Sequence, residues 1–328
     1  MDRLTTLVPI IGGGPAGMSC ALWLHNYGLQ PVIVEQQPAL GGMARASPYP
    51  NEWLLGRPGE SGRRNAELFA QHIRLAAVET WLDARPRRLH RAADGGLRID
   101  IVFVDRRTER SLSCPAVVIA TGTDFRGEKW FDRVENARHL AQAGRVHLGP
   151  SDVGEPGAEL GAHVVVIGGG DNAFDVARML AERGARVTLI MRAQSPRARP
   201  QLVDQLRRYE ASGRARVMTG CSVEALDDLG SGPGSRLGVR LSGGGRIEVD
   251  RVVLLLGYRP NTRGPWLAEL APTLDANGYF MVDGNMETSC RGLFAVGDVA
   301  NPAHPCIATA LASGTMAARE IQRRLAAR

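Results

Sequence analysis

Two stretches of the chain repeat the same order of apolar and polar positions. Each begins with a short apolar run, passes through three glycines, and continues with apolar residues at helical spacing. A second apolar run follows in each stretch, at residues 31–34 in the first and 187–190 in the second. Short apolar runs on either side of a helix are typical of parallel strands buried on both faces. The pattern predicts two strand–helix–strand units, which begin near Leu7 and His163.

Other segments complete the predicted order of elements. We expect further helices at 65–78, 202–208 and 308–325, and further strands at 97–104, 117–120, 251–256 and 292–296. A β-ribbon is expected on either side of the glycine- and serine-rich segment 229–234. We expect the proline- and aromatic-rich segment 47–58 to be irregular, and the segment 123–161 to be loop-rich and to cross between two domains.

The first glycine turn reads Gly12-Gly13-Gly14-Pro15-Ala16-Gly17, and Glu35 stands eighteen residues after Gly17, at the end of the next predicted strand. Glycines in this pattern allow a tight turn and a close approach of the backbone to a pyrophosphate, which the helix N-terminus then stabilises. A carboxylate at the position of Glu35 accepts hydrogen bonds from an unmodified ribose diol. This turn therefore predicts a dinucleotide with a free ribose.

The second turn reads Gly168-Gly169-Gly170-Asp171-Asn172-Ala173, and its downstream position is different. Eighteen residues after Ala173 stands Met191, followed by Arg192. An arginine at this place suits a 2′-phosphate, so the second turn predicts NADPH. Asp171 and Asn172 also fit the ordinary role of capping a helix, and both roles are compatible.

Composition and charge limit the class of protein. The chain has 328 residues, 44% of them hydrophobic, which is enough for two domains with a core each. No apolar run reaches the roughly 18 residues of a membrane span. Glycines at 12–14 interrupt the apolar start, so we expect a cytoplasmic protein without a secretory signal. The net charge of +6 suits an acidic partner, and no nucleic-acid motif accompanies it.

The five cysteines are Cys20, Cys114, Cys221, Cys290 and Cys306. No two of them are separated by two residues, so the chain has neither a Cys-x-x-Cys redox pair nor zinc-type spacing, and we expect no metal site.

With these motifs in view, nearly the whole chain resembles the two-dinucleotide-domain flavoprotein reductases of the thioredoxin-reductase-like kind. The resemblance implies an α/β fold with two Rossmann-like domains, each of three layers, ββα. It places an FAD-binding domain at 1–122 and 266–328, and an NAD(P)H-binding domain inserted at 123–265. It also implies a homodimer.

The resemblance assigns residues to both cofactors. The residues implied for FAD are Gly12, Gly14, Pro15, Ala16, Gly17, Glu35, Gly41, Gly42, Met43, Tyr49, Ala120, Thr121, Gly122, Asp298 and Thr309. The residues implied for NADPH, with NADH as the weaker alternative, are Gly168, Gly170, Asp171, Asn172, Ala173, Arg192 and Arg197.

Within this group, thioredoxin reductases carry Cys-x-x-Cys just before the second glycine turn. Residues 156–162 contain no cysteine here, and dithiol exchange requires two neighbouring thiols. The chain is more similar to the ferredoxin/flavodoxin–NADP+ reductase branch, which lacks the pair. Two features depart from that branch: one arginine of its NADP motif is absent between Arg192 and Arg197, and the chain ends at Arg328 without the branch's C-terminal tail.

Two residues are candidates for the catalytic centre. By resemblance, Tyr49 stacks on the isoalloxazine ring, and Trp53 in the same proline-flanked segment could add to that platform. His304 precedes the final helix and could hydrogen-bond the flavin or relay a proton, although a purely structural role fits a proline-rich loop equally.

The sequence thus predicts an FAD-dependent NADPH oxidoreductase whose electron acceptor is a ferredoxin- or flavodoxin-type protein. A small-molecule acceptor such as a quinone, a disulfide or oxygen is the first alternative, which the missing tail favours. A flavin-binding redox sensor that has lost productive NADPH binding is the second.

Overall fold

The chain forms two compact units in a computed structural model that describes residues 7–105, 108–150, 160–230, 236–301 and 303–327. Unit 1 consists of two segments, Met1–Asp124 and Arg259–Arg328, and unit 2 is the intervening Phe125–Tyr258. The two crossings of the chain, β8 (Thr123–Phe125) and β17 (Tyr258–Pro260), pair as a two-stranded ribbon.

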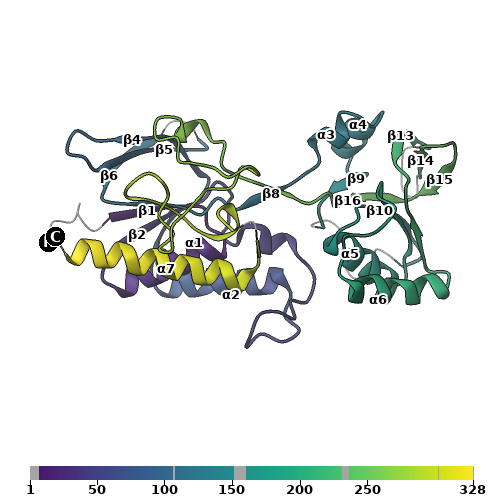
Figure 1. Cartoon of the computed structure of the whole chain (residues 1–328), viewed down its shortest axis with the longest axis horizontal. Helices are drawn as coiled ribbons and strands as arrows, with labels where there is room; N and C mark the ends of the chain where they lie inside the picture. Colours follow the sequence, from purple (N-terminus) through teal and green to yellow (C-terminus); the bar gives the residue numbers. More distant parts are fainter. Residues whose placement is uncertain (1–6, 106–107, 151–159, 231–235, 302, 328) are drawn as a thin grey trace. The chain divides into compact units, whose positions relative to one another are not determined.

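Unit 1 has three layers around a five-stranded parallel sheet (Figure 1). The sheet has the order β18-β7-β1-β2-β3. Helices lie on one of its faces, and the antiparallel sheet β4-β5-β6 lies on the other. The elements are β1 (Leu7–Ile11), α1 (Pro15–Asn26), β2 (Gln30–Val34), η2 (Gly42–Ala46), α2 (Gly62–Leu75), β3 (Glu79–Trp81), β4 (Ala84–Arg91), β5 (Leu97–Phe103), β6 (Glu109–Cys114), β7 (Val117–Ile119), η3 (Pro265–Leu267), β18 (Leu293–Ala295), η4 (Gly297–Val299) and α7 (Ile307–Ala326).

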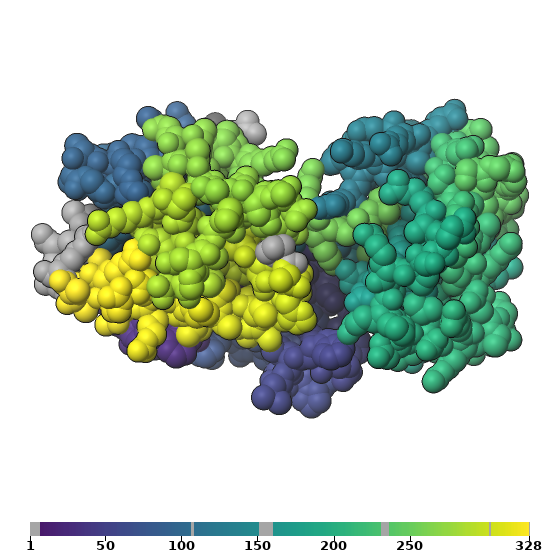
Figure 2. Space-filling view, in the orientation of Figure 1, coloured from purple at the N-terminus to yellow at the C-terminus, as the bar shows by residue number. Residues whose placement is uncertain are grey.

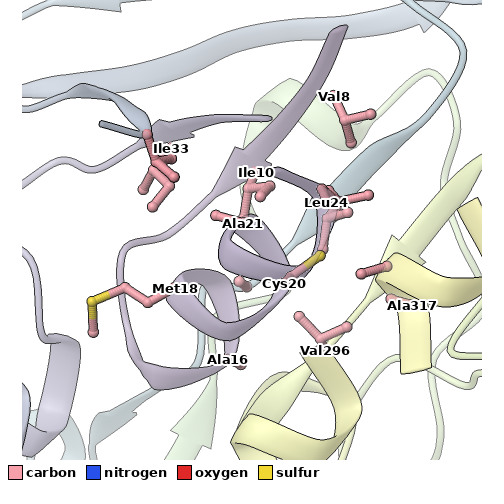
Figure 3. Close-up of a cluster of buried hydrophobic side chains, with 14 of the residues drawn as sticks. Val8, Ile10, Ala16, Met18, Cys20, Ala21, Leu24, Ile33, Val296 and Ala317 are labelled. Carbon is pink, nitrogen blue, oxygen red and sulfur yellow. The ribbon is translucent and has the colours of Figure 1, made fainter. Parts of the chain in front are cut away.

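The alternation of side chains along β1 builds both halves of the core. Val8 and Ile10 face the helices and pack with Leu24 of α1 and Ala317 of α7 (Figure 3). Ile11 belongs to the second cluster, between the parallel sheet and β4-β5-β6. Successive strand residues point to opposite faces, so a continuous apolar run is buried on both sides.

Unit 2 repeats this architecture. Its parallel sheet has the order β12-β11-β10-β16-β9, and β13-β14-β15 form the antiparallel layer. The elements are α3 (Glu128–Phe131), α4 (Ala137–Gln142), β9 (Val146–Leu148), β10 (His163–Ile167), α5 (Asp171–Glu182), β11 (Arg186–Ile190), α6 (Pro200–Ala211), β12 (Ala215–Met218), β13 (Val223–Asp228), β14 (Leu237–Leu241), β15 (Arg246–Val249) and β16 (Arg251–Leu254). The predicted fold class, two three-layer ββα units, is confirmed.

The crossover segment 123–161, expected to be loop-rich, contains the short elements β8, α3, α4 and β9, and β9 is an edge strand of the second parallel sheet. These elements are only three to six residues long, which is too short to give a recognisable period. Residues 151–159 of this segment lie outside the described residues. The predicted ribbon is confirmed as β13 and β14, although residues 231–235 of its connection lie outside the described residues.

Candidate functional site: two glycine turns with opposite charge beside them

The first glycine turn requires glycine for steric reasons. Gly12 has φ +112°, and a Cβ atom there would lie 2.3 Å from the carbonyl oxygen of Ala120, which follows β7. The turn is thus pressed against the adjacent strand, and Gly14 ends it as the N-cap of α1.

Glu35 is buried beside this turn, with only 7% of its surface exposed. Its Oε2 accepts a hydrogen bond of 2.7 Å from the backbone N–H of Gly13, and its Oε1 accepts one of 2.8 Å from the N–H of Gln37. The two donors fix the carboxylate, and a fixed carboxylate at the end of β2 is an acceptor suited to a sugar diol.

The glycine pair after the second strand lies against the first turn. The N–H of Gly41 donates to the carbonyl oxygen of Gly13 at 2.8 Å, and a Cβ on Gly42 would lie 3.0 Å from the Cα of Gly14. Met43 follows in η2 and is half-buried. The structure therefore brings these predicted residues together with Pro15, Ala16 and Gly17, which form the first turn of α1.

The junction residues after β7 also belong to unit 1. The hydroxyl of Thr121 donates to the carbonyl oxygen of Asn261 at 2.9 Å, and the side-chain amide of Asn261 donates to the carbonyl oxygen of Thr121 at 3.0 Å. The N–H of Asn261 donates to the carbonyl oxygen of Gly122 at 3.0 Å. These bonds join the two strand ends where the chain leaves and re-enters unit 1.

Tyr49 and Trp53 lie in a segment that protrudes from the surface of unit 1 (Figure 1, Figure 2). A bridge between Pro50 and Ser61 closes this segment at its base. Tyr49 is half-buried at the base, whereas Trp53 is 75% exposed. The two aromatic residues that the sequence grouped as one platform thus differ in exposure.

Asp298 lies in η4, directly after the buried strand β18. Burial raises the pKa of its carboxyl group to about 6, because the charged form loses solvation there. The neighbouring N–H of Gly297 donates to the hydroxyl of Ser313 on α7 at 2.9 Å, which ties this turn to the helix.

The start of α7 is capped by its own residues. Thr309 accepts from the N–H of Cys306 at 3.3 Å and donates to the carbonyl oxygen of His304 at 2.9 Å. The hydroxyl of Thr309 is therefore engaged in capping. The side chain of His304 is exposed, and its backbone is held by Asn301 through bonds of 2.9 and 3.2 Å.

The second glycine turn has the same construction in unit 2. Gly168 has φ +153°, and a Cβ atom there would lie 2.3 Å from the carbonyl oxygen of Leu255, which follows β16. Gly170 is the N-cap of α5, and Asp171, Asn172 and Ala173 form its first turn. The side-chain amide of Asn172 donates to the hydroxyl of Tyr258 at 2.8 Å.

No carboxylate occupies the position that Glu35 has in unit 1. Met191 is buried there, with its Sδ atom 3.2 Å from the place of a Cβ on Gly169. Arg192 and Arg197 are exposed, and within the described part of the chain neither guanidinium group has a hydrogen-bond or ion-pair partner. Two cations thus stand beside the second turn where an acid stands beside the first.

Both turns fit a bound diphosphate. A Cβ at Gly170 would meet nothing within 4 Å, and one at Gly14 would meet only the Cα of Gly42 at 3.9 Å. Among the described residues, α2 and α7 have a side-chain cap, whereas α1, α5 and α6 have none. The first N–H groups of α1 and α5 are therefore left for a ligand, as in helices that bind phosphate.

The described residues contain neither a metal-binding cluster nor a membrane-spanning helix. Over ranges 7–105, 108–150, 160–230, 236–301 and 303–327, no three His, Cys, Asp or Glu side chains are grouped so that they could hold a metal ion. Over the same ranges, no helix combines the length and apolar character needed to span a membrane.

Sequence reasoning missed several residues that shape these sites. Arg199 is the clearest, because it binds Asp171 of the second glycine turn through two hydrogen bonds of 2.8 Å. Its signal was a third arginine, two residues after Arg197 and directly before the Pro200 that opens α6. Ser313 was missed because a single serine within a helix carries no pattern.

Two dinucleotide-binding folds, with a fixed carboxylate in one and two exposed arginines in the other, are the architecture of a pyridine-nucleotide oxidoreductase that also holds a second dinucleotide. Comparison with known proteins gives the family: the model described as "Pyridine nucleotide-disulphide oxidoreductase" matches residues 6–320, and the chain belongs to this family. It is an oxidoreductase, and FAD and NADPH are the cofactors typical of this family.

Individual relatives carry different names. A protein named ferredoxin–NADP reductase from Ignicoccus hospitalis is 27% identical over 94% of each chain. A protein named glucosaminate ammonia-lyase from Pseudomonas fluorescens is 29% identical over 97% of this chain and 95% of that protein. Among solved structures, the thioredoxin reductase of Lactococcus lactis has a TM-score of 0.80 at 22% identity and covers 99% of this chain and 100% of its own, which shows the fold.

Proposed function

We propose that this protein passes electrons from NADPH through FAD to a one-electron carrier protein of the ferredoxin or flavodoxin type. The supporting observation is the contrast between the two turns. Glu35 is fixed beside one, and beside the other stand Arg192 and Arg197, whose guanidinium groups have no partner among the residues that the structure describes. Several full-length relatives are named ferredoxin–NADP reductase, which supports this class of acceptor. FAD, when bound, supplies the redox chemistry that protein side chains lack.

Unit 1 is the proposed FAD-binding domain. Its glycine turn and the N-terminus of α1 would bind the pyrophosphate, and Glu35 would accept from the ribose. The phosphate end of FAD would be closed by Gly41, Gly42 and Met43. The rest of the cofactor would lie along Ala120, Thr121, Gly122, Asp298 and Thr309. Tyr49 would support the ring, and His304 would lie at the flavin end of α7, where the positive helix terminus favours negative charge.

Unit 2 is the proposed NADPH-binding domain. Gly168, Gly170, Asp171, Asn172 and Ala173 would hold the pyrophosphate at the N-terminus of α5. Arg192 and Arg197 would pair with the 2′-phosphate, since a guanidinium group binds phosphate oxygens through charge-assisted hydrogen bonds. NADH lacks that phosphate and would bind more weakly.

The proposed acceptor is an acidic protein. The chain has a net charge of +6, and opposite net charges accelerate the encounter of electron-transfer partners at low ionic strength.

A second copy of this chain would complete a homodimer, as in the family it resembles.

Steady-state reduction of cytochrome c tests the acceptor. We expect NADPH to bleach the bound flavin, and rapid cytochrome c reduction to require added ferredoxin or flavodoxin and to slow as salt is raised. Turnover that does not depend on either carrier, at any salt concentration, would contradict the proposal.

A substitution at Arg192 tests nucleotide recognition. Arg192→Ala is expected to raise the KM for NADPH by about 10- to 100-fold, as the loss of one charge-assisted phosphate contact implies, and to leave the KM for NADH nearly unchanged. Equal changes in the two constants would exclude Arg192 from reading the 2′-phosphate.

A small-molecule acceptor is the alternative. The relative named glucosaminate ammonia-lyase covers as much of the chain, at similar identity, as the relatives named ferredoxin–NADP reductase, so the scaffold itself does not select a protein acceptor. Direct turnover with a quinone, a disulfide or oxygen at rates that exceed those with carrier proteins would favour this alternative. A flavin that neither NADPH nor NADH reduces would favour a sensor.

A further inference from the structure

The segment from Met191 to Arg199, here called the arginine loop, joins β11 to α6 and is hydrogen-bonded to its neighbours along its length. At its start, the N–H of Met191 donates to the carbonyl oxygen of Met218 at 2.9 Å, and the N–H of Gly220 donates to the carbonyl oxygen of Ala193 at 3.1 Å. Near its end, the N–H of Arg197 donates to the carbonyl oxygen of Gly169, inside the second glycine turn, at 2.8 Å. Its last residue, Arg199, is bound to Asp171.

The Asp171–Arg199 contact uses both oxygens of the carboxylate. Oδ1 accepts from the backbone N–H of Arg199 at 2.8 Å, and Oδ2 accepts from its Nε at 2.8 Å. The side chains are 43% and 49% exposed, so the ion pair alone would contribute little to stability. The geometry is nevertheless specific, because one of the two donors belongs to the backbone and fixes the path of the chain.

This contact joins the first residue of α5 to the N-cap residue of α6. The arginine loop is therefore joined to the glycine turn at Arg197 and again at Arg199. Arg192 and Arg197 stand within this loop, exposed and with guanidinium groups that have no partner among the described residues. The loop holds two cations close to the turn and leaves both available to an anion.

We propose that the Asp171–Arg199 pair is a positioning clamp that sets the preference for 2′-phosphorylated nucleotides over unphosphorylated ones. This inference rests on the proposed reading of the 2′-phosphate by Arg192 and Arg197. A loop that is ordered before binding does not lose that conformational entropy on binding, so the clamp raises the affinity for a ligand that uses the loop. A ligand that uses only the glycine turn gains nothing from it.

The clamp therefore has a signature that a merely structural ion pair lacks. Loss of a structural contact at the N-terminus of α5 would weaken 5′-ADP and 2′,5′-ADP equally, because both place a phosphate at the turn. Loss of the clamp lowers only the ratio of the two affinities. With NADPH as substrate, it raises KM and leaves kcat unchanged.

Calorimetric titration of the FAD-loaded protein with 2′,5′-ADP and with 5′-ADP measures this ratio. Arg199→Gln is expected to weaken 2′,5′-ADP about 5- to 20-fold and 5′-ADP less than about twofold. Because Asp171 also lies in the turn proposed to hold the pyrophosphate, its variants are compared only by the ratio of the two affinities. Asp171→Ala is expected to lower this ratio by a similar factor, and Asp171→Asn, which keeps an oxygen for the N–H of Arg199, is expected to lower it less. The double variant Asp171→Ala/Arg199→Gln should lower the ratio no more than either single variant, since both remove one interaction.

Arg207→Gln is the matched control. Arg207 lies on α6 and pairs with Asp204 at 3.2 Å, so the control removes the same charge from the same helix without touching the arginine loop. Both affinities are expected to stay within about twofold of the parent protein.

The outcomes separate this inference from the proposed function. If the parent protein binds 2′,5′-ADP no more tightly than 5′-ADP, the proposed reading of the 2′-phosphate fails. If the parent discriminates and Arg199→Gln discriminates equally well, only the clamp is refuted. The clamp is also refuted if Arg199→Gln weakens both ligands equally, or if Arg207→Gln reproduces its effect.

Discussion

At the scale of single residues, the two units differ by the side chain that follows the second strand. Glu35 receives two backbone N–H bonds and is held in one orientation, whereas Met191 fills the corresponding place in unit 2 with an apolar thioether. The scaffold is repeated, and the choice of ligand is made by one or two side chains beside each glycine turn.

A substitution at Glu35 tests its role in retaining FAD. Glu35→Gln keeps the size of the side chain but removes its charge, so one of the two backbone N–H groups faces the neutral amide oxygen and the other faces the amide NH2 donor. Loss of a charged acceptor costs about 1.5–3 kcal/mol, which weakens FAD binding roughly 10- to 100-fold. The ratio of flavin to protein absorbance after gel filtration measures retention. The conservative control is Gln37→Ala, whose backbone N–H still binds Glu35, and it should keep its flavin.

Asp298 gives a pH dependence whose sign can be worked out. Its folded-state pKa of about 6 lies above the ordinary value of 3.8, so the folded protein binds a proton more tightly than the unfolded chain does. The free energy of unfolding of the FAD-free protein should therefore fall as pH rises from about 4 to about 6 and then level off. Asp298→Asn removes this loss and should raise stability at pH 7.5 by at most about 3 kcal/mol.

Denaturant unfolding of the FAD-free protein at pH 4.5 and 7.5 checks this prediction. The gain from Asp298→Asn should be present at pH 7.5 and small at pH 4.5, where the parent carboxyl group is already protonated. A gain of equal size at both pH values would mean that the ionisation of Asp298 is not its cause. Asp298→Asn should also weaken FAD retention, because the substituted side chain no longer offers a carboxylate.

At the scale of elements, helices α1 and α7 approach each other through small residues. A Cβ on Gly314 of α7 would lie 2.3 Å from the carbonyl oxygen of Ala16 and 2.9 Å from the amide nitrogen of Cys20. The hydroxyl of Ser19 donates to the carbonyl oxygen of Leu311 at 2.8 Å across the same contact. Because Ala16 belongs to the first glycine turn, this close packing also sets the position of the turn.

Gly314→Ala is therefore expected to destabilise the protein, although helix propensity alone favours alanine. Alanine is the better helix former by about 1 kcal/mol, but the added methyl group meets backbone atoms that cannot rotate away. We expect a net destabilisation of about 1–3 kcal/mol, measured as a lower thermal midpoint, together with weaker FAD retention. Gly284→Ala is the control, since a Cβ there meets nothing within 4 Å, and a midpoint lowered as much by this variant would contradict the steric explanation.

The sequence predicted those elements that carry a strong period or a glycine signal. The strands β1, β2, β10 and β11 and the helices α1 and α7 agree with prediction to within one or two residues. Helix α2 begins three residues earlier than predicted, because Ser61 caps it by accepting from the N–H of Arg64. Strands β4 and β6 were missed, since their exposed positions are filled by arginine, glutamate and serine and their apolar positions are few.

The candidate sites, like the fold, were predicted only in part. The sequence identified both glycine turns and Glu35, because the spacing between strand ends is a property of the chain itself. It could not find Arg199, whose partner Asp171 is twenty-eight residues away and meets it only after β11 and α6 have folded onto the turn. It also could not show that Trp53 is exposed while Tyr49 is half-buried, since this depends on how the segment between them leaves the surface.

At the scale of the whole molecule, each unit has a core of its own. The two clusters on either side of the first parallel sheet contain only residues of unit 1, and the cluster between the second parallel sheet and β13-β14-β15 contains only residues of unit 2. Separate cores allow each unit to be stabilised by its own ligand, because a ligand lowers the free energy of the state that binds it. Each cofactor should thus stabilise the unit that binds it and leave the other unit unchanged.

Hydrogen exchange measured by mass spectrometry tests which unit each cofactor stabilises. Adding FAD to the FAD-free protein is expected to slow exchange at 12–17 and 297–299 and to leave 168–173 unchanged, because the two glycine turns belong to different units. Adding 2′,5′-ADP is expected to slow exchange at 168–173 and 191–199 and to leave 12–17 unchanged. The strands of the antiparallel layers serve as internal references, since no ligand is assigned to them. If FAD alone slowed exchange at the second turn, FAD would not be selected by the turn beside Glu35. The assignment of FAD to the first turn and NADPH to the second would then have to be abandoned.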